Sequence, residues 1–186
     1  NIDMDAFNGC DNLTIYGIAN SYAEKYANEN GINFSALEEF IVENGVLIEY
    51  NGSGGDIVIP GDMRITSIGK YVFCNNQSIT SVKIPDGIEL IGDGAFMECT
   101  NLKSVSFPTN YFRIAPYAFG GAGFITLKYP KNCSGGNWAF YCCENLKEII
   151  VEEGVTSLST GLFDGCSSLK TVTLPSTCTF ILPAFK

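Results

Sequence analysis

The sequence predicts a mostly β repeat solenoid, which is a stack of similar units that share one elongated hydrophobic core. Phenylalanines at positions 73, 96, 119, 140, 163 and 185 are separated by 23, 23, 21, 23 and 22 residues. Prolines at positions 85, 108, 130 and 175 follow four of these phenylalanines. One such unit leaves an apolar face uncovered, so several units must stack to bury it.

Each repeat unit usually places a cysteine or another small residue three positions after its core phenylalanine, and an apolar residue six positions after it. Ile125 fills the later position in the third unit, which is one residue short between Phe119 and Pro130. The segments that lead to the prolines alternate as strands do, so we expect them to form one parallel sheet. A second, less regular strand is expected over residues such as 65–68 and 88–91. The main strand segments are residues 79–85, 102–108, 146–152 and 169–175.

The first 17 residues copy the end of a repeat unit. Phe7, Cys10 and Leu13 have the spacing of a core phenylalanine and of the two apolar or small positions that follow it. A further array is therefore expected upstream, and we interpret the chain as a fragment of a longer repeat protein.

A short N-terminal capping helix is predicted over residues 22–30. Ser21 and Glu24 form a capping box, whose side chains accept hydrogen bonds from N–H groups that otherwise lack partners. Gly31 suits the left-handed position that ends many helices. We expect the apolar stripe of this helix to close the open end of the earlier array. The stripe consists of Tyr22, Ala23, Tyr26 and Ala27.

A β-hairpin is predicted to begin the second array. Asn44 and Gly45 separate two β-branched apolar runs, at residues 40–42 and 46–48, which is a strong hairpin signal. The glycine-rich residues 51–55 are interpreted as a turn, because no lysine or helix start follows them as a phosphate-binding loop requires. We therefore divide the chain into an upstream fragment with its helical cap at 1–37, the hairpin region at 38–63 and the repeats at 64–186.

Composition excludes several classes of function. Twenty acidic and eleven basic side chains give a formal charge of -9, which argues against general binding to nucleic acid or to an anionic membrane. No apolar run approaches the ~20 residues that span a bilayer, so no membrane insertion of this fragment is expected. Histidine is absent, which rules out Ser-His-Asp and Cys-His catalysis. The adjacent carboxylates at 38–39 and 152–153 point to opposite faces of a strand. We expect neither an enzyme nor a cofactor.

Most of the eight cysteines fall at repeat positions, so we interpret them mainly as small, reduced, buried residues. Without histidine or a C-x-x-C pair, a structural zinc site is not expected. Cys143 and Cys166 belong to adjacent turns and are the pair that a disulfide would join. Cys133 lies off the repeat positions and is expected to be the exposed thiol.

Residues 91–108 read I-G-D-G-A-F-x-x-C-x-x-L-x-x-V-x-F-P, which resembles the leucine-rich repeat of the BspA-like class, also called the Treponema pallidum type. This resemblance implies a right-handed leucine-rich repeat superhelix with a parallel sheet. It also implies a bacterial cell-surface or secreted protein, some relatives of which adhere to host matrix proteins or to other cells. The family has no catalytic residues to carry over. Residues 132–136 depart from its pattern, so regular stacking near 120–137 is in doubt.

Five of the eleven basic residues occupy outward positions on the predicted strands, where Glu148 is the only acidic residue. The rest of the chain is strongly acidic, so these lysines are expected to form a basic stripe that binds an anionic patch on a protein or glycan. The alternative is that they only keep the sheet surface soluble. The five are Lys83, Lys103, Lys128, Lys147 and Lys170.

Tyr117 and Trp138 share a column two positions before the core phenylalanine, together with Tyr71. We expect the first two to be neighbours on the surface, where flat aromatic rings suit sugar faces or protein hot spots. The alternative interpretation is that they pack over loops.

The sequence thus favours a non-catalytic adhesion or recognition protein of the bacterial exterior. Its expected partner is a host matrix protein or a neighbouring cell-surface protein, with a glycan as a further candidate. A structural spacer that displays other domains is the alternative, and a glycan-binding module is the third.

Overall fold

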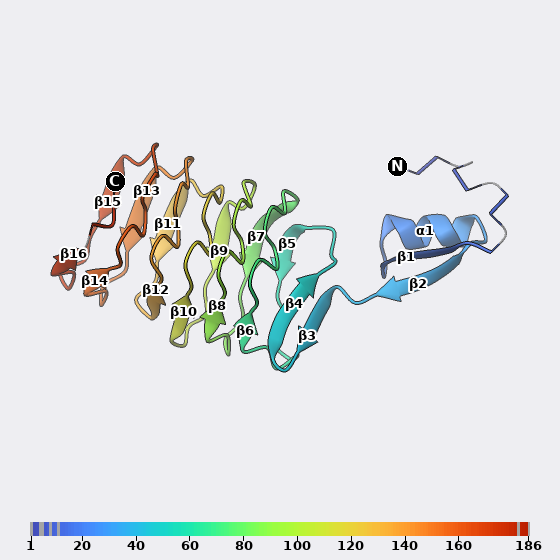
Figure 1. Cartoon of the computed structure of the whole chain (residues 1–186), viewed down its shortest axis with the longest axis horizontal. Helices are drawn as coiled ribbons and strands as arrows, with labels where there is room; N and C mark the ends of the chain where they lie inside the picture. The colour runs from blue at the N-terminus through green and yellow to red at the C-terminus, as the bar shows by residue number, and fades with distance from the viewer. Residues whose placement is uncertain (1, 4–5, 8, 11, 182, 186) are drawn as a thin grey trace.

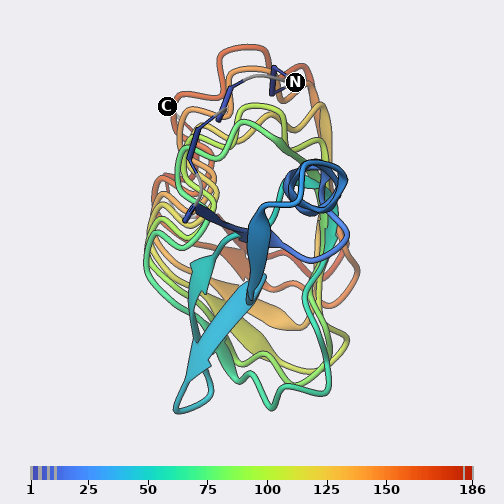
Figure 2. The same cartoon turned by 90° about the vertical axis from the view of Figure 1, so that its right-hand side faces the viewer.

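From residue 40 onward, short strands of two to five residues build a solenoid (Figure 1). A small unit of two strands and one helix precedes it. The computed structural model describes residues 2–3, 6–7, 9–10, 12–181 and 183–185. Viewed along the long axis, the successive turns superimpose closely, as expected for a repeat solenoid (Figure 2). The elements are β1 (Thr14–Ile18), α1 (Tyr22–Glu29), β2 (Asn33–Leu37), β3 (Phe40–Glu43), β4 (Val46–Tyr50), β5 (Gly55–Val58), β6 (Ser67–Ile68), β7 (Ile79–Lys83), β8 (Leu90–Ile91), β9 (Ser104–Ser106), β10 (Phe112–Ile114), β11 (Thr126–Tyr129), β12 (Cys133–Gly135), β13 (Glu148–Val151), β14 (Ser157–Leu158), β15 (Thr171–Thr173) and β16 (Phe180–Ile181).

The predicted helix forms, and it connects two parallel strands, β1 and β2, that the sequence analysis missed. The Ser21 side chain accepts a hydrogen bond from the N–H of Glu24 at 3.4 Å. The Glu24 carboxylate accepts one from the N–H of Asn20, one residue before the position that a standard capping box uses. Tyr26 is a buried residue of the helix, and its ring forms a T-shaped contact with the ring of Phe7, with the centroids 6.0 Å apart. This contact places the helix on the repeat-like residues that precede it.

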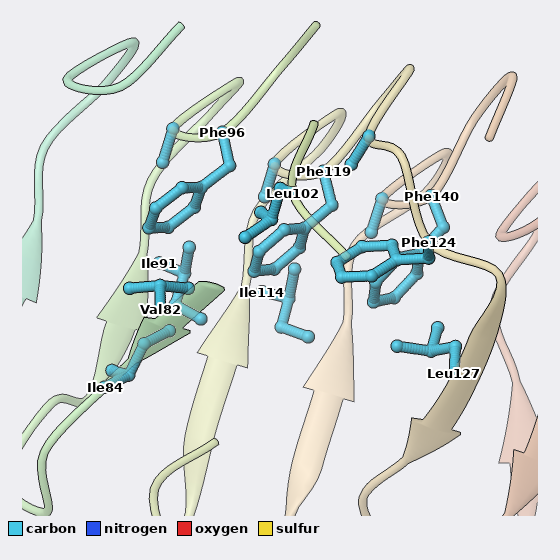
Figure 3. Close-up of a cluster of buried hydrophobic side chains, with 14 of the residues drawn as sticks. Val82, Ile84, Ile91, Phe96, Leu102, Ile114, Phe119, Phe124, Leu127 and Phe140 are labelled. Atoms are coloured by element: carbon cyan, nitrogen blue, oxygen red, sulfur yellow. The ribbon is translucent and has the colours of Figure 1, made fainter. Parts of the chain in front are cut away.

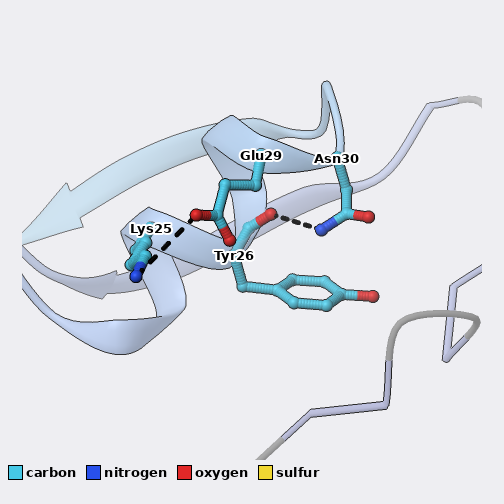
Figure 4. A network of polar contacts seen from close by, with 4 residues as sticks. All are labelled: Lys25, Tyr26, Glu29 and Asn30. Carbon is cyan, nitrogen blue, oxygen red and sulfur yellow. Dashed lines mark hydrogen bonds and ion pairs between the residues drawn. The ribbon is translucent and has the colours of Figure 1, made fainter.

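Polar contacts close the C-terminal end of α1 (Figure 4). The Asn30 side-chain amide donates to the carbonyl of Tyr26 at 2.8 Å, and Lys25 forms an ion pair with Glu29 one turn along the helix. Gly31 has a φ of +65°, the left-handed conformation that the sequence predicted for it.

The predicted hairpin is present as antiparallel β3 and β4. Asn44 and Gly45 have φ values of +50° and +78°, as a type I′ turn requires. Strand β4 then pairs in parallel with β6 and so begins the stacking of the solenoid. The continuous hydrophobic core starts here, with Phe40 and Leu47 as its first members.

The repeats form two walls. Strands β3, β4, β6, β8, β10 and β12 make one sheet of six strands, which we call the long sheet. The expectation of one main parallel sheet in the opposite wall was wrong. That wall consists of two three-stranded sheets, β5-β7-β9 and β11-β13-β15, which we together call the split sheet. Residues 133–135, where the sequence left regular stacking in doubt, pair with β10 as strand β12.

A continuous stack of phenylalanine rings fills the space between the walls, as Figure 3 shows for its central members. The rings of Phe73, Phe96, Phe119 and Phe140 lie 4.6, 5.1 and 5.3 Å apart and are nearly parallel. All four side chains are at most 1% exposed. The ring separation matches the strand spacing of about 4.8 Å, so one phenylalanine per turn suffices to fill the centre.

The predicted cysteine ladder is also buried, and each of its thiols has a polar role. The Sγ atoms of Cys99, Cys143 and Cys166 donate to the carbonyl oxygens of core phenylalanines one turn earlier, at 2.9 to 3.3 Å. All eight cysteines are free, including the pair Cys143 and Cys166. Cys133 was wrongly predicted as the exposed thiol. Its side chain is half-buried against Tyr129, and burial raises its pKa to about 12, whereas Cys10 is exposed.

In the shortened third unit, a different residue fills the core position that precedes the strand. Phe124, and not Ile125, occupies the inward position that precedes the strand, where it packs against Phe119 and Phe140 at 5.9 and 6.2 Å (Figure 3). Counted back from Pro130, Phe124 has the place that Leu102 has relative to its own proline. The assignment of Ile125 to the core was therefore wrong, since its side chain is 49% exposed.

Candidate binding face on the split sheet

The five lysines of the predicted stripe are all exposed on the side of the split sheet. They fall into two rows instead of one. Lys83 and Lys128 lie within strands β7 and β11, two residues before the proline that ends the segment. Lys103, Lys147 and Lys170 lie immediately before strands β9, β13 and β15, three residues earlier in the unit. With a rise of about 3.3 Å per residue, the two rows run roughly 10 Å apart across the same wall. We call this surface the lysine face.

Within the lysine face, the structure brings Lys147 and Lys170 directly side by side. The N–H of Lys170 donates to the carbonyl of Lys147 at 2.9 Å, so the two residues occupy equivalent places on adjacent turns. Lys103 and Lys128 are in different rows, and no ladder bonds join their strands, so the single continuous stripe that the sequence predicted is divided. The lysine face therefore has its densest positive charge near the last two turns.

One lysine of the face is neutralised locally. Lys128 Nζ lies 2.8 Å from a carboxylate oxygen of Glu152, which occupies the proline position of the fourth unit. Hydrogen bonding to this ammonium group lowers the pKa of Glu152. The other four lysines of the face form no ion pair with any described residue. Four unpaired positive charges thus face solvent in a chain of formal charge -9.

The two predicted aromatic residues are neighbours, as the sequence analysis expected. The rings of Tyr117 and Trp138 stack 5.8 Å apart with an interplanar angle of 8°. Tyr141, which the sequence analysis missed, forms a T-shaped contact with Tyr117, with the ring centroids 5.8 Å apart. Tyr117 and Tyr141 remain 39% and 41% exposed, so the cluster is open to solvent on one side. We call these three residues the aromatic cluster.

The opposite side of Trp138 is not free. A Cβ atom at Gly161 would collide with its indole ring, so the indole covers that glycine on the next turn. Tyr71 covers Gly94 in the same way. Packing over the adjacent turn thus accounts for one face of each of these two rings.

Other chemistry is sparse in the described part of the chain. Among the described residues, no group of three or more histidine, cysteine or acidic side chains is arranged to hold a metal ion. None of the described helices has the length and apolar character needed to cross a bilayer. Burial raises the pKa of the Cys99 thiol to about 12, so this ladder thiol is a poor nucleophile near neutral pH. The described surface therefore offers charge on the lysine face and aromatic rings in the turns that carry the aromatic cluster.

Sequence reasoning missed two residues that shape this surface. Ile125 would have been found by counting back from Pro130 instead of forward from Phe119. Glu152 would have been found from its place in the repeat, since a carboxylate at the proline position must lie near the end of the neighbouring strand.

Comparison with known families identifies the repeat. The profile described as "BspA type Leucine rich repeat region" matches six copies across residues 66–185. None of the curated proteins matches the chain significantly in sequence.

Several solved structures share the fold. The T. pallidum leucine rich repeat protein has a TM-score of 0.55 and 23% identity, covering 73% of this chain and 77% of that one. A leucine rich cell surface protein of Faecalibacterium prausnitzii has a TM-score of 0.56 and 33% identity, covering 76% and 42%. The pneumococcal vaccine antigen PcpA has a TM-score of 0.60 and 19% identity, covering 83% and 39%. The chain thus spans less than half the length of the last two proteins.

Proposed function

Because the chain belongs to the BspA-type leucine-rich repeat family, we propose that it is a non-catalytic recognition protein of the bacterial exterior, which adheres to an acidic protein partner through its lysine face. Leucine-rich repeat folds are protein-binding scaffolds, and one similar structure is described as a cell surface protein. Host matrix proteins and proteins of neighbouring cells are the partners we propose.

The observation that carries this proposal is the segregation of charge. Four lysines without ion-pair partners in the described structure lie on one wall of the solenoid, in a chain whose formal charge is -9. A basic face on an acidic protein attracts an acidic surface at long range and repels most other orientations. Repetition of the unit extends this face over several turns, which suits a large partner more than a small molecule.

Two matched variants test the proposal. Lys147→Glu combined with Lys170→Glu reverses the densest part of the face, while Lys25→Glu combined with Lys70→Glu reverses two lysines away from it. Each variant makes the same change in net charge. We expect the first to lower binding to immobilised matrix proteins at least tenfold at low salt, and the second to leave it nearly unchanged.

Ionic strength provides the second readout. Binding of the wild-type chain should weaken as salt rises, and the Lys147→Glu/Lys170→Glu variant should lose most of that dependence. Equal binding and equal salt dependence for both variants would refute recognition by the lysine face. Absence of any saturable partner among matrix proteins, mucin and cell-wall glycans would favour the structural spacer instead.

The aromatic cluster supports a second candidate, a glycan-binding role. Stacked rings with exposed edges present the flat apolar surface on which sugar rings pack. Trp138 is the only tryptophan of the chain, so its fluorescence reports directly on this cluster. A saturable shift of indole emission with mucin or cell-wall glycans, lost in Tyr117→Ala, is the expected result. Unchanged emission with every glycan would remove this candidate.

A further inference from the structure

The shortened third unit changes the split sheet at two places. The residue is missing between Ala122 and Phe124, so Phe124 enters the core and Ile125 moves to the surface. Downstream of this point, strand β11 does not pair with β9, and the split sheet is interrupted there. One deletion therefore produces both an exposed aliphatic residue and a gap in the strand ladder.

At the start of the strands, Ile125 interrupts a row of polar residues. The N–H of Lys147 donates to the carbonyl of Ile125 at 2.8 Å, just as the N–H of Lys103 donates to Thr80 one repeat earlier. Ile125 stands five residues before Pro130, as Lys103 stands five residues before Pro108, so by position in the unit the row reads Thr80, Lys103, Ile125, Lys147 and Lys170. Ile125 is flanked on both adjacent turns by a lysine without an ion-pair partner.

At the end of the strands, the interruption opens a hollow of about 290 Å³. Val105 and Phe107 line it and are only half-buried, whereas the equivalent Val82 and Ile84 on the intact part of the sheet are 2% and 3% exposed. Pro108 and Pro130 add further apolar walls, and Lys128, Lys131 and Glu152 stand at its rim. The break thus exposes core-type side chains next to positive charge.

We propose that the break between β9 and β11 is the docking point for an extended acidic polypeptide segment that carries apolar side chains. Its apolar side chains would pack on Ile125 and in the hollow, and its carboxylates would pair with the lysines around them. Lys128 and Lys131 line the hollow together with Glu152, and Lys103 and Lys147 hold the row positions on either side of Ile125. Two acids, Glu152 and Glu148, stand against these four lysines. Charge complementarity therefore selects an acidic segment, and the exposed aliphatic surface selects an apolar one.

This inference rests on the proposed recognition by the lysine face. It adds that most of the binding free energy comes from one part of that face, the break between β9 and β11. Aliphatic surface that is desolvated at the centre of an interface commonly contributes more than charges at its rim. The lysines around Ile125 would then set orientation and association rate, while Ile125 and the hollow would hold the partner.

Three labelled decapeptides provide the probes. The first alternates Asp and Leu, the second alternates Asp and Ser, and the third alternates Lys and Leu. Binding to the full chain is followed by fluorescence anisotropy. We expect the Asp-Leu peptide to bind roughly tenfold more tightly than the Asp-Ser peptide, and the Lys-Leu peptide not to bind.

A matched pair of variants locates the site. Ile125→Thr replaces the exposed isoleucine by the residue that stands in the same row at position 80. Val58→Thr removes a similar exposed β-branched residue from β5, which lies two strands from β9 on the same wall. The first should weaken Asp-Leu binding roughly tenfold and leave Asp-Ser binding unchanged, whereas the second should change neither. Thermal melting of both variants verifies that they fold.

The failures are distinguishable. Equal binding of the Asp-Leu and Asp-Ser peptides, with no effect of Ile125→Thr but a loss in Lys147→Glu/Lys170→Glu, would overturn docking at the break and leave lysine-face recognition standing. No binding of any acidic peptide would overturn the inference, and the matrix-protein experiment above would then decide on the lysine face alone. Binding of maltoheptaose that is lost in Ile125→Thr would overturn the assignment to a polypeptide.

Discussion

At the scale of single residues, the turns around each core phenylalanine require backbone conformations that most side chains avoid. The position two residues before it has a φ between +56° and +63° in five units, at Tyr71, Gly94, Tyr117, Trp138 and Gly161. Such a conformation costs a residue with a Cβ atom about 1–2 kcal/mol. The aromatic residues offset this cost by packing on the next turn. Tyr71 and Trp138 lie over Gly94 and Gly161, and Tyr117 stacks on Trp138.

Gly123 has a different and stricter constraint, because it lies where the third unit lost a residue. A Cβ atom at this position would fall well inside contact distance of the Thr100 carbonyl oxygen, which belongs to the backbone of the preceding turn. Only glycine lets the shortened loop pass this carbonyl and place Phe124 in the core.

We therefore expect Gly123→Ala to lower the free energy of unfolding by about 3 kcal/mol, since the backbone must move to relieve the collision. Chemical denaturation followed by circular dichroism measures this change. Gly61→Ala is the control, because its Cβ would meet only the Pro85 side chain at 3.5 Å. Both substitutions reduce the freedom of the unfolded chain equally. Equal stability of the two variants would show that the loop at Gly123 is not constrained as described.

At the scale of the structural element, the ring stack is the feature that joins one repeat to the next. Each ring lies between those of the adjacent turns, so its removal leaves a void in a column that cannot easily collapse. Phe96 is fully buried between Phe73 and Phe119 and has the shortest ring separation of the series, at 4.6 Å.

Phe96→Ala should cost roughly 3 to 5 kcal/mol of unfolding free energy, measured by urea denaturation. Tyr111→Ala is a suitable comparison, since that ring is 63% exposed and should contribute much less. Near-wild-type stability of Phe96→Ala would mean that the stack is not the main support of the core.

Most elements could be predicted because each carries a local signal. The phenylalanine spacing predicted the repeating turns, and Asn44-Gly45 predicted the hairpin. The interruption of the split sheet could not be read in this way. The third unit can be aligned forward from Phe119 or backward from Pro130, and only packing decides that Phe124 is inside. Cys133 was misplaced for a similar reason, because its burial depends on Tyr129.

The lysine face was predictable in composition but not in arrangement. Sequence spacing identified all five lysines, and counting back from each proline position separates them into two rows. The missing pairing between β9 and β11, which divides the face, appears only in the structure. The pairing of Lys128 with Glu152 depends in addition on two strands being adjacent in space.

At the scale of the whole molecule, exposed carboxylates join adjacent turns outside the core. Hydrogen bonds from Ser81 and Thr80 lower the pKa of Asp56, and the N–H and hydroxyl of Thr109 lower the pKa of Asp86. The Lys128 ammonium group lowers the pKa of Glu152. In each case the partner lies one turn away, so these groups act between units instead of within them.

The folded-state pKa values of these three acids lie below their unfolded values. The acids therefore make their full contribution to the free energy of unfolding at neutral pH. This contribution is lost as pH falls below the ordinary carboxyl range of about 4 to 4.5 and through the lower folded pKa values. The unfolding midpoint in urea should therefore decrease over this range. We expect a variant combining Asp56→Asn, Asp86→Asn and Glu152→Gln to be less stable at pH 7, and its unfolding midpoint to depend less on pH.

The control combines Glu43→Gln, Glu49→Gln and Asp62→Asn. These acids have no hydrogen bond or ion pair in the described structure, so the control should keep the wild-type dependence of the unfolding midpoint on pH. Parallel curves for the two variants would contradict a role for these acids in joining the turns.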